Sequence, residues 1–214
     1  MKSIQSMVAV TLFAAVAAGC GDTSGPGTGD VRVYMNKASV TSAQTSGYSM
    51  AALMLGTIPI TAVDSINVVL TSIEAVNVSD SSGGVSISLQ GAGTTSLNLM
   101  RLALSDSTLL ARGTLPAGTY NNIRLRFSSA SIRLNQQVTV GQAVYPAGTY
   151  DLTVPSGLSS GIKVQGASFT IANDASTSVT LTFDPTTTVG TIVATGSNKL
   201  MMSPVLHVRT HVGD

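Results

Sequence analysis

The sequence is poor in several residue types on which common protein functions depend. Only 10% of its residues are charged and the formal net charge is +1, so the basic surface of a nucleic-acid-binding protein is not expected. Aromatic residues make up 4% and tryptophan is absent, which weakens any hypothesis based on sugars stacking against aromatic faces. The chain is instead rich in glycine, serine, threonine, valine and alanine, a composition that argues against a helical protein and against charge-rich disorder.

Cysteine occurs only once, at Cys20, so the chain cannot form an intramolecular disulfide. A positive charge at Lys2 is followed by an apolar run over residues 7–18 that ends in small residues, the pattern of a secretory signal. As a helix this run would rise only about 18 Å, against a hydrocarbon core of about 30 Å. We therefore predict that residues 1–19 are a signal peptide rather than a permanent transmembrane anchor.

The residues that end this run, Ala17-Ala18-Gly19-Cys20, resemble the lipobox of bacterial lipoproteins. The resemblance implies cleavage before Cys20 and attachment of a diacylglycerol to its sulfur, which together with a further acyl chain gives stable anchoring. The alternative is an ordinary cleaved signal in which Cys20 is incidental. Gly21 rather than an aspartate follows the cysteine, which favours the outer membrane as the location within a bacterial cell envelope.

Downstream of the cysteine, the composition divides the chain into a tether and one folded domain. Residues 20–30 are rich in glycine and lack large apolar side chains, which predicts a flexible tether. Residues 31–214 contain many short segments in which apolar and polar residues alternate, separated by clusters of Gly, Asn, Asp and Pro. This pattern predicts an all-β domain, an antiparallel β-sandwich of immunoglobulin-like or prealbumin-like type. We expect one core to contain Ile66, Val68, Leu70, Ile123, Leu125, Phe127, Phe169, Val179, Leu181 and Phe183.

Three segments depart from simple alternation. Residues 97–112 are rich in Leu, Ala and Met and precede a glycine, which predicts the end of a strand at 97–99 and then one or two short helical turns. Residues 38–56 begin polar and end apolar, and we expect an insertion that packs over one edge of the sandwich. The sequence Pro-Ala-Gly-Thr-Tyr occurs at 116–120 and again at 146–150. Because proline and glycine suit a tight turn, we interpret it as a hairpin entry used twice.

Several blocks of the chain together resemble DUF4382, a domain of unknown function found in bacteria and archaea. The blocks are INVVLTSIEAVNV (66–78), TSLNLMRL (95–102), GTLPAGTYNNIRLRF (113–127), FTIANDASTSVTLTFDP (169–185) and NKLMMSPVLHVRT (198–210). The resemblance covers most of residues 31–210 and implies a β-sandwich of exported proteins, often lipoproteins. Residues 37–62 depart from the family pattern, because they are longer and lack an expected turn aspartate, which puts any ligand site at that turn in doubt.

Three arginines at predicted outward-facing strand positions form a candidate ligand-contact patch: Arg124, Arg126 and Arg133. If neighbouring strands bring them together, they could contact an anionic glycan or lipid head group. The alternative is that they keep the surface soluble and protect a strand edge. The two histidines, His207 and His211, share the wetter face of one predicted strand. They lie about 13 Å apart along it, too far to bind one metal ion.

The motif G-x-S-x-G at 157–161 provides a catalytic alternative, a serine hydrolase with Ser159 as nucleophile. Its base and acid would come from His207 or His211 and from Asp151 or Asp184. Such a motif must follow a strand and open a helix, whereas a strand-like segment follows here.

We find no paired carboxylates, phosphate loop or zinc-ligand spacing in the sequence, and we expect neither a metal nor a cofactor. The sequence therefore predicts a non-catalytic, lipid-anchored module of the cell envelope. Its expected partners are the membrane, through the lipid on Cys20, and an envelope polysaccharide or surface protein, with no nucleic acid among them.

Overall fold

The computed structural model describes residues 27–39, 57–77, 84–89, 93–104, 106–155, 161–164, 168–195 and 199–213. Cys20, the predicted signal peptide, most of the predicted tether and Ser159 lie outside the described residues, as does most of the predicted insertion. The strands are β1 (Thr28–Lys37), β2 (Val63–Asn77), β3 (Val85–Leu89), β4 (Thr95–Asn98), β5 (Thr108–Pro116), β6 (Gly118–Leu134), β7 (Val138–Val140), β8 (Ala143–Tyr145), β9 (Gly148–Thr153), β10 (Ile162–Val164), β11 (Phe169–Ile171), β12 (Ser176–Phe183), β13 (Val193–Ala194), β14 (Leu200–Met201) and β15 (Leu206–Gly213). The helical segments are η2 (Ile60–Ala62), η3 (Leu99–Arg101) and α2 (Pro185–Gly190).

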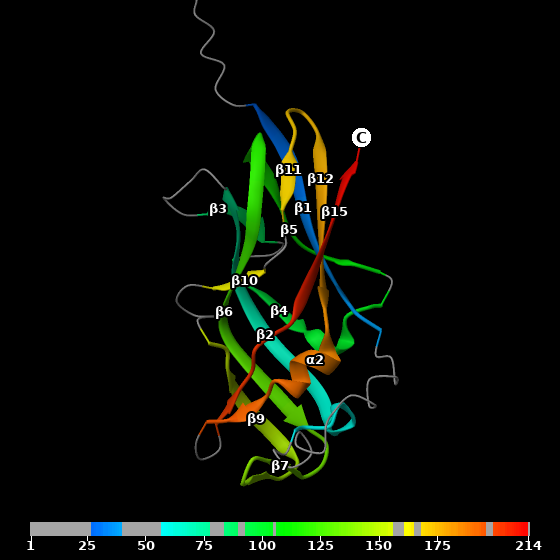
Figure 1. The fold of residues 1–214 in the computed structure, drawn as a ribbon, viewed down its shortest axis with the longest axis vertical. Helices are drawn as coiled ribbons and strands as arrows, with labels where there is room; N and C mark the ends of the chain where they lie inside the picture. The colour runs from blue at the N-terminus through cyan, green and yellow to red at the C-terminus, as the bar shows by residue number, and fades with distance from the viewer. Residues whose placement is uncertain are drawn as a thin grey trace, which may run out of the picture.

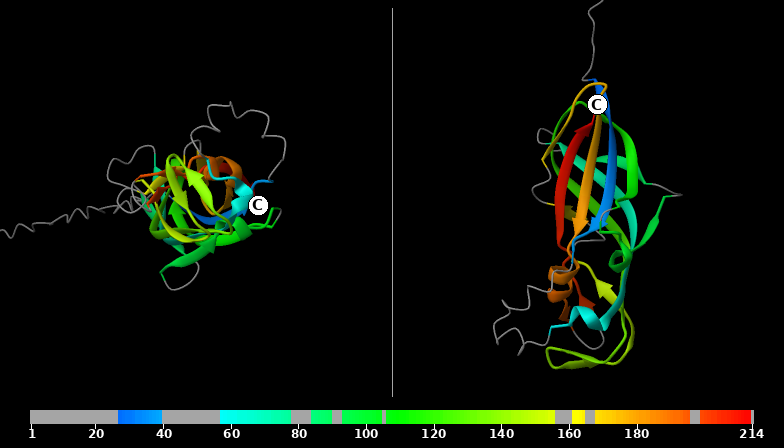
Figure 2. Two further views of the ribbon diagram at one scale, coloured as in Figure 1. Left: turned by 90° about the horizontal axis from the view of Figure 1, so that it is seen from below. Right: turned by 90° about the vertical axis from the view of Figure 1, so that its right-hand side faces the viewer.

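The strands form two layers, as an all-β sandwich requires (Figure 1). One layer has the order β5-β1-β12-β15, and the right-hand view of Figure 2 shows it in front of the long strand β2. The other layer is built on β2 and β6, with β9, β10 and β11 along the far edge of β6. Strand β3 pairs with both β2 and β5 and so joins the layers. Pairing is mostly antiparallel, the parallel pairs among the described strands being β1–β12 and β9–β14. The predicted fold class is confirmed.

The predicted core is also confirmed, since all ten residues expected in it are buried. The reason is the period of two in strands such as β12, where every second side chain points inward. In β6 the alternation breaks at Ser128 and Ser129, two consecutive exposed residues, and resumes at Ala130. The long strand therefore contains a β-bulge, and the sequence segments 122–127 and 130–134 are parts of one element.

The helical prediction for residues 97–112 is correct only at its start. Strand β4 ends at Asn98, whose side chain accepts a hydrogen bond from the Met100 backbone N–H and opens the short 3-10 helix η3. Residues 108–112 are not helical but begin β5. The α-helix α2 lies elsewhere. Its N-cap is Asp184, which accepts a hydrogen bond of 2.9 Å from the Thr187 backbone N–H. Proline follows the cap at the first helical position, which it favours because its φ is already helical.

The repeated Pro-Ala-Gly-Thr-Tyr segments form corners rather than hairpins. The first connects β5, which pairs with β1 and β3, to β6, which pairs with β2 and the edge strands, so the chain changes layers there. In both copies the tyrosine hydroxyl donates to the carbonyl of the proline four residues earlier, at 2.9 Å from Tyr120 and 2.8 Å from Tyr150. The interpretation as hairpin entries is therefore wrong. The repeat marks a tyrosine-braced corner used twice.

The first strand begins at one end of the sandwich. Strand β1 starts at Thr28, so three residues assigned to the tether belong to the sheet. Asp30 lies beside Ser176, which in turn pairs with Gly213, and the backbone N–H of Ala117 donates to the Gly27 carbonyl. The N-terminal strand, the C-terminal strand and the start of β6 therefore meet at the same end, which we call the anchor end (Figure 1).

Candidate functional site

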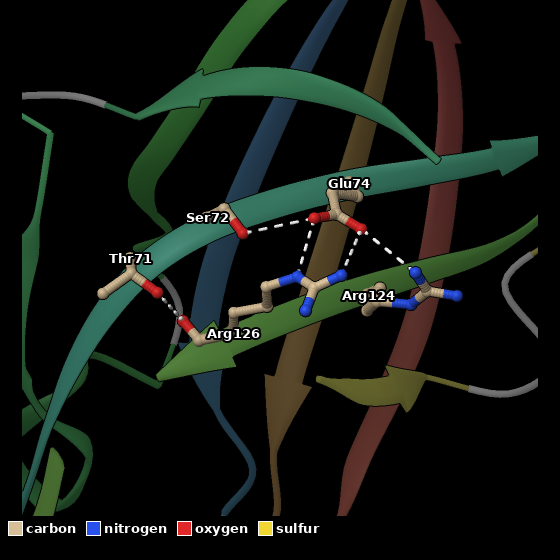
Figure 3. Close-up of polar contacts among 5 residues, drawn as sticks. All are labelled: Thr71, Ser72, Glu74, Arg124 and Arg126. Atoms are coloured by element: carbon tan, nitrogen blue, oxygen red, sulfur yellow. Dashed lines mark hydrogen bonds and ion pairs between the residues drawn. The ribbon is translucent and has the colours of Figure 1, made fainter. Parts of the chain in front are cut away.

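Two of the three predicted patch arginines lie beside a carboxylate on the outer face of the long strands. The antiparallel register of β2 and β6 pairs Glu74 with Arg124 and Ser72 with Arg126, so all four side chains project to the same side of the sheet. Figure 3 shows the glutamate between the two guanidinium groups. We call Ser72, Glu74, Arg124 and Arg126 the Glu74 cluster.

The contacts in this cluster are short and use both carboxylate oxygens of Glu74. Arg126 donates from Nε to Oε1 at 2.7 Å and from Nη2 to Oε2 at 3.3 Å, and Arg124 donates from Nη1 to Oε2 at 3.2 Å. The Arg126 pair is the bidentate arrangement that suits a planar guanidinium. Only 13% of the Glu74 side chain is exposed, against 17% for Arg124 and 29% for Arg126.

The electrostatics of the cluster favour the charged forms. The hydrogen bond from Arg126 lowers the pKa of Glu74 below its ordinary value, and the positive charges of both arginines add to this effect, while partial burial opposes it. The hydrogen bond to Glu74 in turn raises the pKa of Arg126. These shifts describe an ion-pair network that holds β2 and β6 together, rather than an open cationic surface.

A glycine explains why Arg124 is so little exposed. Strand β10 pairs with β6 at residues 123–125, and Gly161 comes just before it. A Cβ atom at Gly161 would lie 2.6 Å from the Cγ atom of Arg124, and the glycine has a φ of +72°, which an L side chain rarely adopts. The close approach buries the Arg124 Nε atom, which has no hydrogen-bond partner among the described residues. Arg124 is therefore a largely buried partner of Glu74 rather than a solvated surface charge.

The third arginine of the predicted patch does not join the other two. Arg133 lies near the opposite end of β6, where its Nε atom is 3.4 Å from Asp64 Oδ2. Both side chains are well exposed, at 64% and 49%. They line an open depression of about 580 Å³ at the far end of the molecule, together with the second tyrosine corner. The structure thus separates Arg133 from the Glu74 cluster and gives each arginine an acidic neighbour.

The residues of the hydrolase alternative are only partly described. His207 is 64% exposed, and its Nε2 atom lies 3.9 Å from Asp184 Oδ2. That carboxylate also accepts hydrogen bonds from the backbone N–H and the hydroxyl of Thr187, both at 2.9 Å. Asp151 lies on β9. Ser159 and the His211 side chain lie outside the described residues.

A groove that the sequence analysis did not identify lies between β6 and β9. The ladder joining these strands ends at the pair Ser131–Asp151, beside the bulge of β6. Beyond it the strands separate around a cavity of about 310 Å³. We call this the β6–β9 groove, and its lining residues are Phe127, Ser128, Ser129, Ala130, Asp151, Leu152, Thr153 and Val154. The sequence signal was the Ser128-Ser129 pair, which interrupts the alternation of the strand.

The described residues also limit the chemistry of the site. No group of three or more His, Cys, Asp or Glu side chains among them could hold a metal ion. None of the helices in this part of the chain is long and apolar enough to cross a membrane.

The fold and these sites define an all-β sandwich with an internal ion-pair network and an open groove beside a bulged strand. A family model described as a domain of unknown function, DUF4382, matches residues 52–204, and the chain belongs to this family. No curated protein and no solved structure matches the chain.

Proposed function

We propose that the protein is a non-catalytic binding module held at a bacterial cell envelope by a lipid on Cys20, with the outer membrane as its location. The observation that carries this proposal is the placement of the anchor end relative to the groove. The backbone hydrogen bond between Gly27 and Ala117 ties the start of the described chain to the start of β6. From there β6 runs away from the anchor end along the length of the molecule (Figure 1).

The distances suit a module that presents its far half to a partner. Ser128 lies ten residues beyond Gly118 in β6, about 33 Å from the anchor end at a rise of about 3.3 Å per residue. The segment between Cys20 and Gly27 spans at most about 25 Å when fully extended. A lipid on Cys20 would therefore hold the anchor end toward the membrane, with the β6–β9 groove and the Arg133 depression directed away from it.

Metabolic labelling tests the anchor. When the full chain is expressed in a bacterial host with labelled palmitate, we expect label on the wild-type protein and none on Cys20→Ala. The labelled protein should also fractionate with outer membranes. Wild-type protein that carries no label and is released in soluble form would contradict the proposal and leave ordinary secretion.

The hydrolase alternative makes a different prediction. Asp184 already caps α2 with its carboxylate, and this role accounts for its position without a catalytic function. We expect a fluorophosphonate probe to leave the protein unlabelled. Labelling that is lost in Ser159→Ala would show that the protein is an enzyme.

A further inference from the structure

We propose that the β6–β9 groove binds an uncharged saccharide unit of an envelope or extracellular polymer. This inference rests on the proposed function, because it names the ligand class that such a binding module would take. It is carried by the shape of the groove, by the side chains that line it and by the interrupted strand pairing that creates it.

The groove exists because two irregularities coincide. On the β2 side of β6, the register passes from Val69–Ser129 directly to Leu70–Phe127, so Ser128 has no partner there. On the other side, continued antiparallel pairing with β9 would join Ser129 to Thr153, but the ladder stops at Ser131–Asp151. A bulge bends its strand, and the regular pairing of β6 with β9 ends beside it.

The lining combines an apolar floor with a hydroxylated rim. Phe127, Ala130 and Leu152 are nearly buried, with exposed fractions of 6%, 8% and 5%, and supply the floor. The rim carries the hydroxyls of Ser128, Ser129 and Thr153 and the carboxylate of Asp151, all on exposed residues. Among the described residues, these four side chains have no hydrogen-bond or ion-pair partner that would occupy them.

This combination matches the surface of a sugar ring. A pyranose presents C–H groups on its faces, which can pack on an apolar floor, and hydroxyls around its edge. Serine and threonine hydroxyls both donate and accept hydrogen bonds, while a carboxylate only accepts, so the rim can satisfy several sugar hydroxyls at once. The volume of about 310 Å³ lies at the small end of the range for ligand pockets and suits one residue of a chain.

The charges of the groove favour a neutral ligand. Among the described residues that line the groove, Asp151 is the only charged one, and it would repel a uronate or a phosphorylated sugar. The arginine nearest to Asp151 in the ladder is Arg133, two residues from the partner Ser131, and Arg133 is paired with Asp64. Arg126, which precedes Phe127 in β6, is paired with Glu74, so each of these positive charges already has a counter-ion. A single carboxylate among three hydroxyl-bearing residues also suits a hydroxyl-rich ligand better than a lysine-rich peptide. Only one of the successive positive charges of such a peptide could pair with Asp151.

The test uses the full chain purified in lauryldimethylamine oxide, a detergent without a sugar head group. The probes are arrayed oligosaccharides of glucose, galactose, mannose and N-acetylglucosamine, with glucuronate and galacturonate oligomers and an oligolysine peptide as comparison ligands. We expect binding to at least one neutral array member. Asp151→Asn should weaken that binding about tenfold or more, the usual scale for a hydrogen bond to a charged group.

A second variant and a matched control separate the groove from the rest of the molecule. Ser129→Leu should fill the groove and abolish binding, and Asp106→Asn, which removes an exposed aspartate outside the groove, should leave the affinity unchanged. Circular dichroism and thermal unfolding verify that each variant folds. Because Asp151→Asn preserves the size of the side chain, it keeps the test valid even if Ser129→Leu fails to fold.

Four outcomes would overturn the inference. They are no binding to any neutral oligosaccharide, binding only to the acidic oligomers, binding only to oligolysine, and neutral binding that is unchanged in every groove variant that folds. The palmitate experiment is independent of these outcomes. An unlabelled protein that still binds sugar through the groove would contradict only the lipid-anchor proposal. A lipidated protein that does not bind sugar would contradict only this inference.

Discussion

Replacing Glu74 by glutamine should destabilise the protein much more than a conventional surface substitution. The carboxylate accepts three hydrogen bonds from two guanidinium groups and is 13% exposed. In Glu74→Gln the new amide N–H₂ group would face guanidinium donors, and two positive charges would lose their counter-ion. Breaking a fully buried ion pair costs about 3–5 kcal/mol and an exposed pair about 0–1 kcal/mol. For this half-buried network we expect a loss of about 2 kcal/mol in the free energy of unfolding.

The effect should also depend on pH. Because the folded protein lowers the pKa of Glu74 from its ordinary value of 4.5, the cluster stabilises the fold fully above that value. The stabilisation is lost as the pH falls through the lowered folded-state pKa, since protonated Glu74 no longer attracts the arginines. The difference in stability between wild type and Glu74→Gln should therefore be largest near neutral pH and should shrink in acid.

Urea denaturation measured from pH 7 to pH 3 tests this reasoning, with Asp64→Asn as the matched control. Asp64 also pairs with an arginine of β6, but both partners are largely exposed, so its replacement should cost less than about 0.5 kcal/mol. Equal costs for the two variants, or a Glu74→Gln difference that does not change with pH, would refute the argument that partial burial makes this network important.

Three further predictions concern the fold, each measured by the midpoint of chemical denaturation. Tyr120→Phe leaves the Pro116 carbonyl without its hydroxyl donor and should cost about 1–2 kcal/mol because the Tyr120 side chain is buried, whereas the same change at the less buried Tyr150 should cost less. Equal effects would mean that burial does not set the strength of the corner. Leu125→Ala should cost about 2–5 kcal/mol because Leu125 is completely buried, and a loss below about 1 kcal/mol would contradict its place in the core. Asp184→Ala removes the N-cap of α2 and should cost about 1 kcal/mol, so an unchanged midpoint would show that the cap is dispensable.

The strands and the core were predictable because they depend on local alternation. In β12, for example, Val179, Leu181 and Phe183 follow a strict period of two, and all three are buried. The N-terminus of the helix α2 could also be predicted from the sequence. Asp184 followed by Pro185 is a recognised N-cap signal, but the helix has only six residues, too few to show a helical period of apolar residues in the sequence.

The arginine patch was not predictable, because alternation shows which way a side chain points but not what lies over it. Arg124 and Arg126 do point away from the core, as expected. Their partner, Glu74, lies fifty residues before Arg124 in the sequence, and only the register of β2 against β6 brings them together. Gly161, which lies just before β10, packs against Arg124 and covers it. No local sequence pattern indicates this contact.

The position of the β6–β9 groove follows from two sequence features that act together. The adjacent polar residues Ser128 and Ser129 create the bulge, and this much can be seen in the sequence. The repeated corner determines where β9 begins, since Gly148 of that corner pairs with Leu134 and sets the register of every later pair. From this pair the ladder continues toward the bulge and ends where Asp151 lies opposite Ser131. The position of the groove therefore depends on two things, the register of β9 that the corner sets and the bulge in β6. A change in the corner that shifts β9 along β6 should alter the groove, although no residue that lines the groove is replaced.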